Sequence, residues 1–147
     1  MSKFFSFPFL VAAISGIAMA IQGTLNSSLS QKSSLLSATL VVHLIGTLVS
    51  LVAVLAWRAP LLNYNWTSVP WYLYLGGILS VLIVGLVAVS IPKVGVCNAT
   101  TAIIIGQVSM AVLIDHFGWF GMSRHSWTPS QFIGVALFAA GAKLLFR

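Results

Sequence analysis

Residues 94–117 read VGVCNATTAIIIGQVSMAVLIDHF, an apolar run in which Asp115 is the one charged side chain. A helix of roughly 17 to 25 such residues crosses a hydrocarbon core about 30 Å thick, so the run predicts a transmembrane helix. Asp115 is also the one acidic residue among 147, against seven Lys and Arg. Hydrophobic residues make up 59% of the chain and its mean hydropathy is +1.06, whereas a soluble protein keeps about a quarter of its residues charged. The composition therefore predicts an integral membrane protein.

Four further apolar stretches of similar length flank this run. Together they predict an all-α membrane protein with five transmembrane helices in a single domain, residues 1–147. After the third stretch, Ile91–Lys93 contains a proline and predicts a tight turn. Thr128 and Gln131 have the spacing of a capping box and predict the start of the last helix. The predicted helices are about residues 4–29, 35–57, 71–91, 94–117 and 129–146.

Tryptophans and basic residues gather at the predicted ends of the spans. An indole ring favours the membrane–water boundary, and Lys and Arg side chains there reach anionic lipid headgroups. The lipid bilayer therefore accounts for the net charge of +6, and we expect no nucleic-acid partner. Cys97 is the single cysteine and has no metal-ligand spacing, so we expect neither a metal nor a cofactor. The tryptophans are Trp57, Trp66, Trp71, Trp119 and Trp127.

The basic residues are shared almost evenly between the two faces of the membrane. Five spans place the termini on opposite sides, and we call the side of the N-terminus side A and the other side B. A bias of Lys and Arg between flanking loops sets orientation, and here the bias is nearly absent. We therefore predict that the chain inserts in both orientations and forms an antiparallel homodimer; the alternative is that a small charge difference or a partner fixes one orientation. Side A holds Lys3, Arg58 and Arg124, and side B holds Lys32, Lys93, Lys143 and Arg147.

A few polar side chains lie within the predicted spans, where an unpaired polar group is costly and often marks a site or a pathway. Gln22 and Asn26 share a face of the first helix, and His43 lies in the second. The third and fifth helices carry glycines in place of polar side chains, so we predict that helices one, two and four line any cavity. The polar residues of the fourth helix are Asn98, Thr100, Thr101, Gln107, Ser109, Asp115 and His116.

Each candidate has a structural alternative. Gln22 and Asn26 either bind substrate or join helices by hydrogen bonds. Gln107 follows a glycine that permits close approach of a ligand or helix, and we favour it as a substrate-binding residue. His43 is either a neutral imidazole bonded to a carbonyl or a proton-responsive group. Asp115 is either a proton carrier or an interfacial residue paired with Arg124 or with the loop amides of residues 117–121.

Depth along the helices favours the inverted pair. At a rise of about 1.5 Å per residue, Gln22 and His43 lie roughly 10 to 12 Å from side B, whereas Gln107 lies roughly 20 Å from it. A second copy turned upside down would bring its Gln107 level with Gln22 and His43 of the first. Transporters built from inverted repeats place their substrate sites near this depth.

The sequence does not favour an enzyme. It contains no carboxylate pair for acid–base chemistry, no Gly-rich phosphate loop and no two-histidine metal motif. A membrane-embedded hydrolase or transferase needs at least one such arrangement, so we expect no catalytic residues.

Two stretches carry a resemblance to a known family: Gly16–Leu29, which contains Gln22 and Asn26, and Gly106–Gly118, which contains Gln107 and Asp115. They resemble the YdcZ-like inner-membrane exporters of the drug/metabolite transporter superfamily, and the similarity extends over essentially the whole chain. The resemblance implies a multi-pass bacterial inner-membrane protein with a single five-helix repeat, half of the ten-helix unit of larger relatives. It also implies roles for Gln22, Asn26, Gln107 and Asp115, the residues that the family motifs emphasise.

We therefore expect an exporter that moves a small polar metabolite by alternating access across an inverted homodimer. The related small multidrug-resistance exporters use a glutamate in the first helix, but this first helix carries Gln22 and Asn26 and no carboxylate. A neutral or weakly charged substrate therefore fits better than a permanently cationic drug. The alternatives are a passive channel of dual topology and a subunit that requires a paralogous partner.

Overall fold

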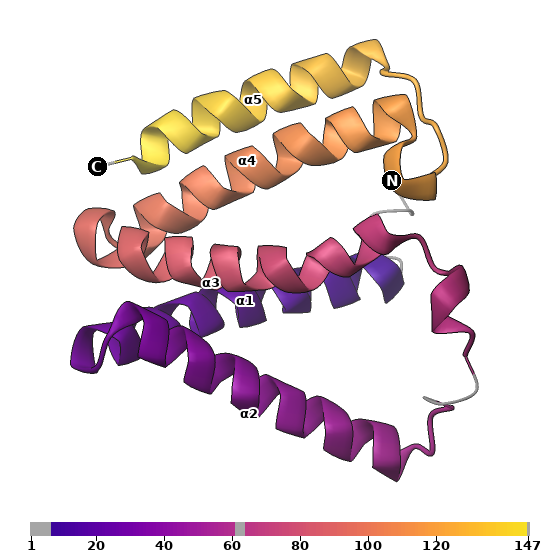
Figure 1. The fold of residues 1–147 in the computed structure, drawn as a ribbon. Coiled ribbons are helices and arrows are strands. Elements are labelled where there is room, and N and C mark those ends of the chain that lie inside the picture. Colours follow the sequence, from indigo (N-terminus) through magenta and orange to yellow (C-terminus); the bar gives the residue numbers. More distant parts are fainter. Residues whose placement is uncertain (1–6, 61–63, 147) are drawn as a thin grey trace. The chain divides into compact units, whose positions relative to one another are not determined.

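The computed structural model describes residues 7–60 and 64–146 of the chain. Within these residues the secondary structure is helical, without strands, as Figure 1 shows. The chain divides into two compact units, Met1–Pro92 and Lys93–Arg147, and each is described by itself. The α-helices are α1 (Phe7–Lys32), α2 (Leu35–Ala56), α3 (Leu75–Val94), α4 (Val96–Phe117) and α5 (Pro129–Leu145), and the short 3-10 helices are η2 (Trp66–Ser68), η3 (Trp71–Tyr74) and η4 (Trp119–Gly121).

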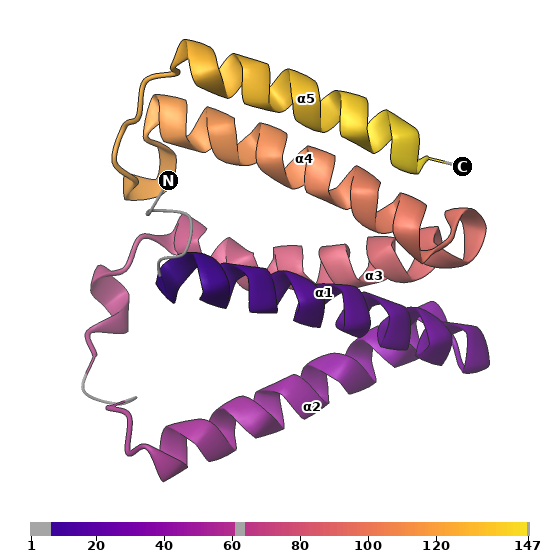
Figure 2. The same ribbon diagram turned by 180° about the vertical axis from the view of Figure 1, so that it is seen from behind.

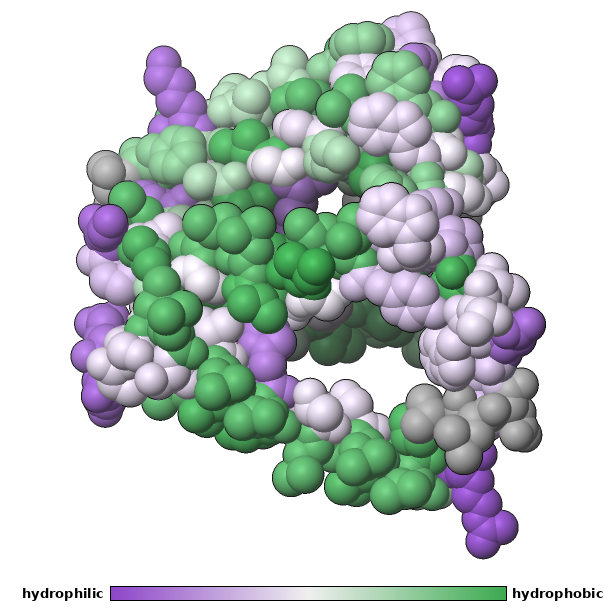
Figure 3. Space-filling model, in the orientation of Figure 1, coloured by the Kyte–Doolittle hydropathy of each residue, from purple (hydrophilic) through white to green (hydrophobic). Residues whose placement is uncertain are grey.

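Four helical segments are long and apolar enough to cross a membrane: α1, α2, Trp71–Val94 and α4. The prediction of an all-helical, membrane-spanning chain is thereby confirmed. Large apolar side chains cover the outer faces of these helices, as the green surface of α2 and α3 in Figure 3 shows. The fifth helix, α5, has 17 residues, which correspond to about 25 Å at the helical rise. That α5 is a fifth span stays a prediction.

In the first unit, α1 packs closely against α3 through two small residues. A Cβ atom added at Gly23 would lie 3.0 Å from Val87 Cγ1 and 3.5 Å from Ile91 Cδ1. One turn later, Ser27 is 2% exposed and its hydroxyl donates to the Ala88 carbonyl at 3.4 Å. Small residues allow such close approach, which drives association of helices in lipid. Figure 2 shows α1 running alongside α3.

The second helix begins against α1 and then diverges from it. Ser34 caps α2, and its Oγ accepts a hydrogen bond from the Ser37 amide at 3.1 Å. Ala38 and Thr39, in the first turns of α2, are buried. Farther along, α2 leaves α1 and α3, as both ribbon views show. A groove lined by residues of α1, α2 and α3 lies in this unit.

The turn after the third helix differs from the predicted one. A tight turn at Ile91–Lys93 was wrong, because α3 continues through Pro92 to Val94 and the chain turns at Gly95, with φ 83°. Pro92 lies in the last turn of α3, where its missing N–H leaves only the Ala88 carbonyl without its usual donor. The Ser27 hydroxyl supplies a donor to that carbonyl. The helix can therefore pass through the proline.

In the second unit, α4 and α5 lie side by side in opposite directions (Figure 1). Gly118 ends α4 in the left-handed conformation, with φ 66°, which glycine adopts without strain. The following loop folds back on the end of α4, as described below. At the start of α5, Gln131 Oε1 accepts from the Thr128 amide at 2.8 Å, and the predicted capping box is present.

Candidate functional site

A groove in the first unit brings together polar side chains from three helices. It opens between α2 and α3, with α1 behind, and has a volume of about 550 Å³. The space-filling view is hollowed at the same place (Figure 3). The lining residues are Gln22 of α1, Val42, His43, Gly46, Thr47, Ser50, Leu51 and Val54 of α2, and Ser80 and Val84 of α3.

His43 forms hydrogen bonds to two of the helices that line the groove. Its Nδ1 lies 2.8 Å from the Thr39 carbonyl oxygen, and its Nε2 lies 3.0 Å from Ser80 Oγ. A carbonyl oxygen only accepts, so Nδ1 carries a hydrogen; in the neutral ring Nε2 then accepts the Ser80 hydroxyl hydrogen. This assignment follows from the hydrogen-bond network. The imidazole thus joins α2 to α3 across the groove.

Two further hydroxyls of α2 are satisfied by their own helix. Thr47 Oγ1 donates to the His43 carbonyl and Ser50 Oγ donates to the Gly46 carbonyl, each at 2.8 Å. Such bonds to the carbonyl four residues earlier use the only hydrogen of a hydroxyl. The oxygen lone pairs of Thr47 and Ser50 remain available to a ligand in the groove.

The two predicted polar residues of α1 have different surroundings. Gln22 lines the groove and is exposed, and within residues 7–60 and 64–92 its amide has no hydrogen-bond partner. Asn26 is 8% exposed and is absent from the groove lining. It lies beside Ser27, at the level where α1 packs on α3. The structure therefore brings Gln22 and His43 to one groove and leaves Asn26 outside it.

Sequence reasoning missed Ser80. The prediction that the third helix adds no polar side chain to a cavity was wrong, because Ser80 lines the groove and bonds to His43. The available signal was the hydroxyl of Ser80 within the apolar run Ile78–Gly85. The helix was instead interpreted from its glycines. Its pairing with His43 depends on how α2 and α3 cross, and sequence spacing does not specify that crossing.

The fourth-helix candidates lie in the second unit. Gln107 is exposed in the middle of α4, and its amide has no hydrogen-bond partner within residues 93–146. Asp115 is exposed near the end of α4, and within the same residues its carboxylate forms no ion pair. Whether these residues bind substrate or carry protons stays a prediction.

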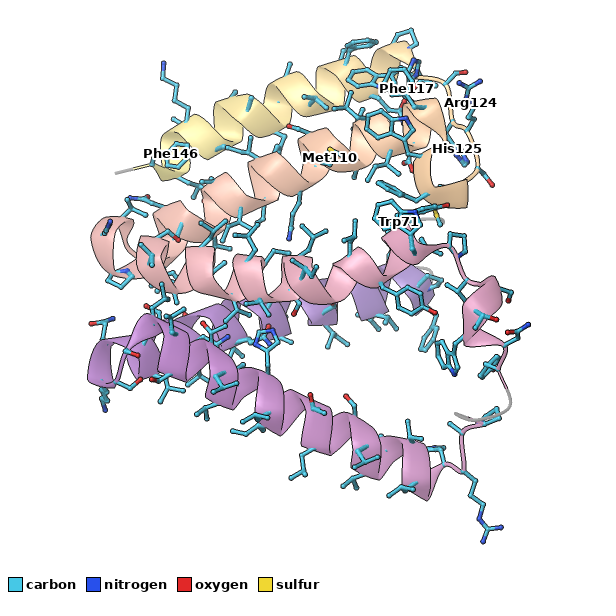
Figure 4. All side chains as sticks on the ribbon, viewed as in Figure 1. Trp71, Met110, Phe117, Arg124, His125 and Phe146 are labelled. Atoms are coloured by element: carbon cyan, nitrogen blue, oxygen red, sulfur yellow. The ribbon has the colours of Figure 1, made fainter. Side chains whose placement is uncertain are left out.

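The loop after α4 contradicts the expected partners of Asp115. Arg124 Nε donates to the Phe117 carbonyl at 3.1 Å and does not pair with the carboxylate. The His125 amide donates at 2.8 Å to the backbone carbonyl of Asp115. Figure 4 shows Arg124 and His125 on this loop beside Phe117. Both contacts satisfy carbonyls at the end of the helix, where a cationic side chain is also favourable. The loop therefore caps α4 and leaves the carboxylate exposed.

The groove lining contains no Lys, Arg, Asp or Glu, so its polarity is that of hydroxyls, an amide and an imidazole. In the part of the chain that the structure describes, His, Cys, Asp and Glu form no group of three or more that could hold a metal ion. Cys97 is exposed and free. The arrangement is suited to hydrogen bonding of a small solute.

A comparison with protein families gives one match. A family model described as "Putative inner membrane exporter, YdcZ" covers residues 7–144, nearly the whole chain. No curated protein and no solved structure matches the chain. The family match confirms the resemblance seen in the two sequence stretches that carry Gln22 and Gln107.

Proposed function

Because the chain belongs to the YdcZ family of inner membrane exporters, we propose that it moves a small polar, uncharged or weakly charged metabolite by alternating access. The chain is a multi-pass inner-membrane protein, and its family is one of transporters and not of enzymes. The substrate class, the transport mechanism and the assembly are our proposals.

The groove of the first unit is the observation that carries this proposal. Polar side chains within membrane-spanning helices are costly, and they tend to face a cavity or a pathway. Here Gln22, His43 and Ser80 come from three different helices and face one groove of about 550 Å³. That volume lies within the usual range for small-molecule sites. We assign substrate contact to these residues, with His43 as the candidate proton carrier inside the groove.

The proposed assembly is an antiparallel homodimer. Gln22 lies ten residues before the end of α1 on side B, and Gln107 lies ten residues before the end of α4 on side A. Each amide is thus about 15 Å from the end of its helix. Gln107 also lies eleven residues after the start of α4, about 16 Å, so it is near mid-span and level with Gln22 in either orientation. Depth therefore does not distinguish an inverted pair, and the nearly even flanking charges are what support it. Pairing between copies would also satisfy amides that hydrocarbon cannot hydrate.

The symmetry of such a dimer relates the two end states of the transport cycle. Because the two copies are identical and oppositely oriented, an exchange of their conformations converts the inward-open state into the outward-open state, and the two states are equal in energy. The two states then do not differ in conformational free energy. The direction of net movement follows the gradients of substrate and protons. A carboxylate such as Asp115 is a second candidate carrier for those protons.

Flux through reconstituted vesicles tests the proposal. We expect saturable flux of an uncharged or weakly charged metabolite, and we expect Gln22→Leu to abolish it, because leucine has a similar size and no hydrogen-bonding group. Gln107→Leu should have the same effect. Gln31→Leu is the matched control, because Gln31 is exposed in the last turn of α1 and does not line the groove. Undiminished flux in Gln22→Leu vesicles, or ion currents of channel magnitude, would contradict the proposal.

A further inference from the structure

Each hydroxyl that lines the groove already donates its hydrogen to an acceptor within the protein. Thr47 and Ser50 donate to carbonyls of α2, and Ser80 donates to Nε2 of the neutral His43 ring. Each hydroxyl has one hydrogen and two lone pairs, so these three residues present acceptors to the groove. His43 offers no additional donor, because its Nδ1 hydrogen is bound to the Thr39 carbonyl. Only the Gln22 amide can both donate and accept.

While the His43 ring is neutral, the groove also lacks a countercharge. No Lys, Arg, Asp or Glu lines it, so an ionic ligand would lose its hydration without gaining an ion pair. Removing an ion from water is unfavourable even after the protein relaxes. Four of the lining residues, Val42, Leu51, Val54 and Val84, are aliphatic. A ligand with a C–H face beside its donors would contact both kinds of wall.

We infer that the groove selects an uncharged solute rich in hydrogen-bond donors, of the polyol or primary-amide class. This inference rests on the proposed function, and it narrows the substrate from polar metabolites in general to those that supply the O–H or N–H groups. The hydroxyl oxygens of Thr47, Ser50 and Ser80 receive those hydrogens. The Gln22 amide meets the remaining polar group of the solute.

A matched set of ligands tests the donor requirement. The purified protein is heated with xylitol, with its permethylated ether, which keeps the oxygens but has no donor, and with xylonate, which adds a negative charge. A ligand that binds the folded state raises the melting temperature by mass action. We expect xylitol to stabilise the protein and the other two to have no effect. Equal stabilisation by the ether or by xylonate, or none by xylitol, would overturn the inference.

A matched pair of variants locates the binding. Thr47→Val keeps the shape of the side chain and removes an acceptor oxygen, and we expect it to weaken xylitol binding about twofold to tenfold. Thr24→Val is the control, because Thr24 also donates to a carbonyl four residues earlier, at 2.9 Å, but lies outside the groove lining. Unchanged affinity in Thr47→Val, with both variants melting as the wild type does, would overturn the assignment.

Flux separates failure of the inference from failure of the proposed function. If vesicles carry an ionic metabolite in a saturable manner that Gln22→Leu abolishes, while xylitol does not move, the inference is wrong and the proposed function stands. If no metabolite of any charge moves, the proposed function itself is wrong.

Discussion

At the scale of single residues, many Ser and Thr hydroxyls in the spans donate to a carbonyl of their own helix. Thr24, Thr39, Thr101 and Ser109 each donate to the carbonyl four residues earlier, at 2.8 to 2.9 Å. Such a bond lets a hydroxyl face lipid at little cost, so a serine or threonine in a span is weak evidence for a site. Polar groups that such a bond does not satisfy are more informative. The Gln22 amide has no partner in the described part of the first unit. His43 retains Nε2 for Ser80 after Nδ1 has bonded to Thr39.

The His43 assignment makes a direct spectroscopic prediction. Because the Thr39 carbonyl lies 2.8 Å from Nδ1, the neutral ring should carry its hydrogen on Nδ1 and leave Nε2 unprotonated. In protein labelled with nitrogen-15 histidine, we expect this tautomer for the signal that disappears in His43→Gln. Ser80→Ala should leave the tautomer unchanged, since Thr39 and not Ser80 determines it. A neutral ring protonated on Nε2 would contradict the assignment.

The residue types within the apolar spans were enough to predict some of the groove residues, but not all of them. Gln22 and His43 could be recognised because an amide and an imidazole are rare within an apolar span. Asn26 looked equivalent to Gln22, since four residues return to nearly the same side of a helix. Their surroundings differ because α2 diverges along α1 (Figure 2), so one turn of the helix separates a buried position from an open one. That divergence is a tertiary property that periodicity does not encode.

At the scale of helices, length and hydropathy were enough to predict which segments span the membrane. The predicted end of a helix was wrong where a contact with another helix determines it. The limits of α4 depend on local signals, since Gly95 precedes it and Gly118 ends it, both with positive φ. The end of α3 depends on a distant residue as well, because Ser27 of α1 donates to the carbonyl that Pro92 leaves free. The proline alone therefore predicted the end of the third helix too early in the sequence.

A double-mutant cycle tests that contact. We expect Ser27→Ala to lower the free energy of unfolding by about 1 kcal/mol, because the buried Ala88 carbonyl loses its donor. In a Pro92→Ala background the same substitution should cost less, since the amide of the new alanine can bond to Ala88 within the helix. Unfolding titrations in mixed micelles measure all four proteins. An equal cost of Ser27→Ala in both backgrounds would show that proline and serine are not coupled.

At the scale of the whole molecule, the tryptophans distinguish the two faces more clearly than the charges do. In the described structure each tryptophan lies at a helix end or in a short 3-10 helix. If the five spans alternate in direction, all of these ends fall on side A. An inverted pair would then place one aromatic face and one lysine-bearing face in each leaflet. The boundary with the lipid headgroups would be equivalent on both sides of such a dimer.

Opposite orientation of identical copies is the claim on which the transport cycle depends, and cysteine labelling in intact cells measures it. Ser68→Cys reports side A and Ser33→Cys reports side B, each in a Cys97→Ala background; both serines are exposed and lie between spans. A membrane-impermeant maleimide is added outside, and permeabilised cells give the total. Because the flanking charges give no clear bias, we expect about half of the molecules of each variant to react from outside. Full labelling of one variant with none of the other would show a single orientation and contradict the inverted dimer.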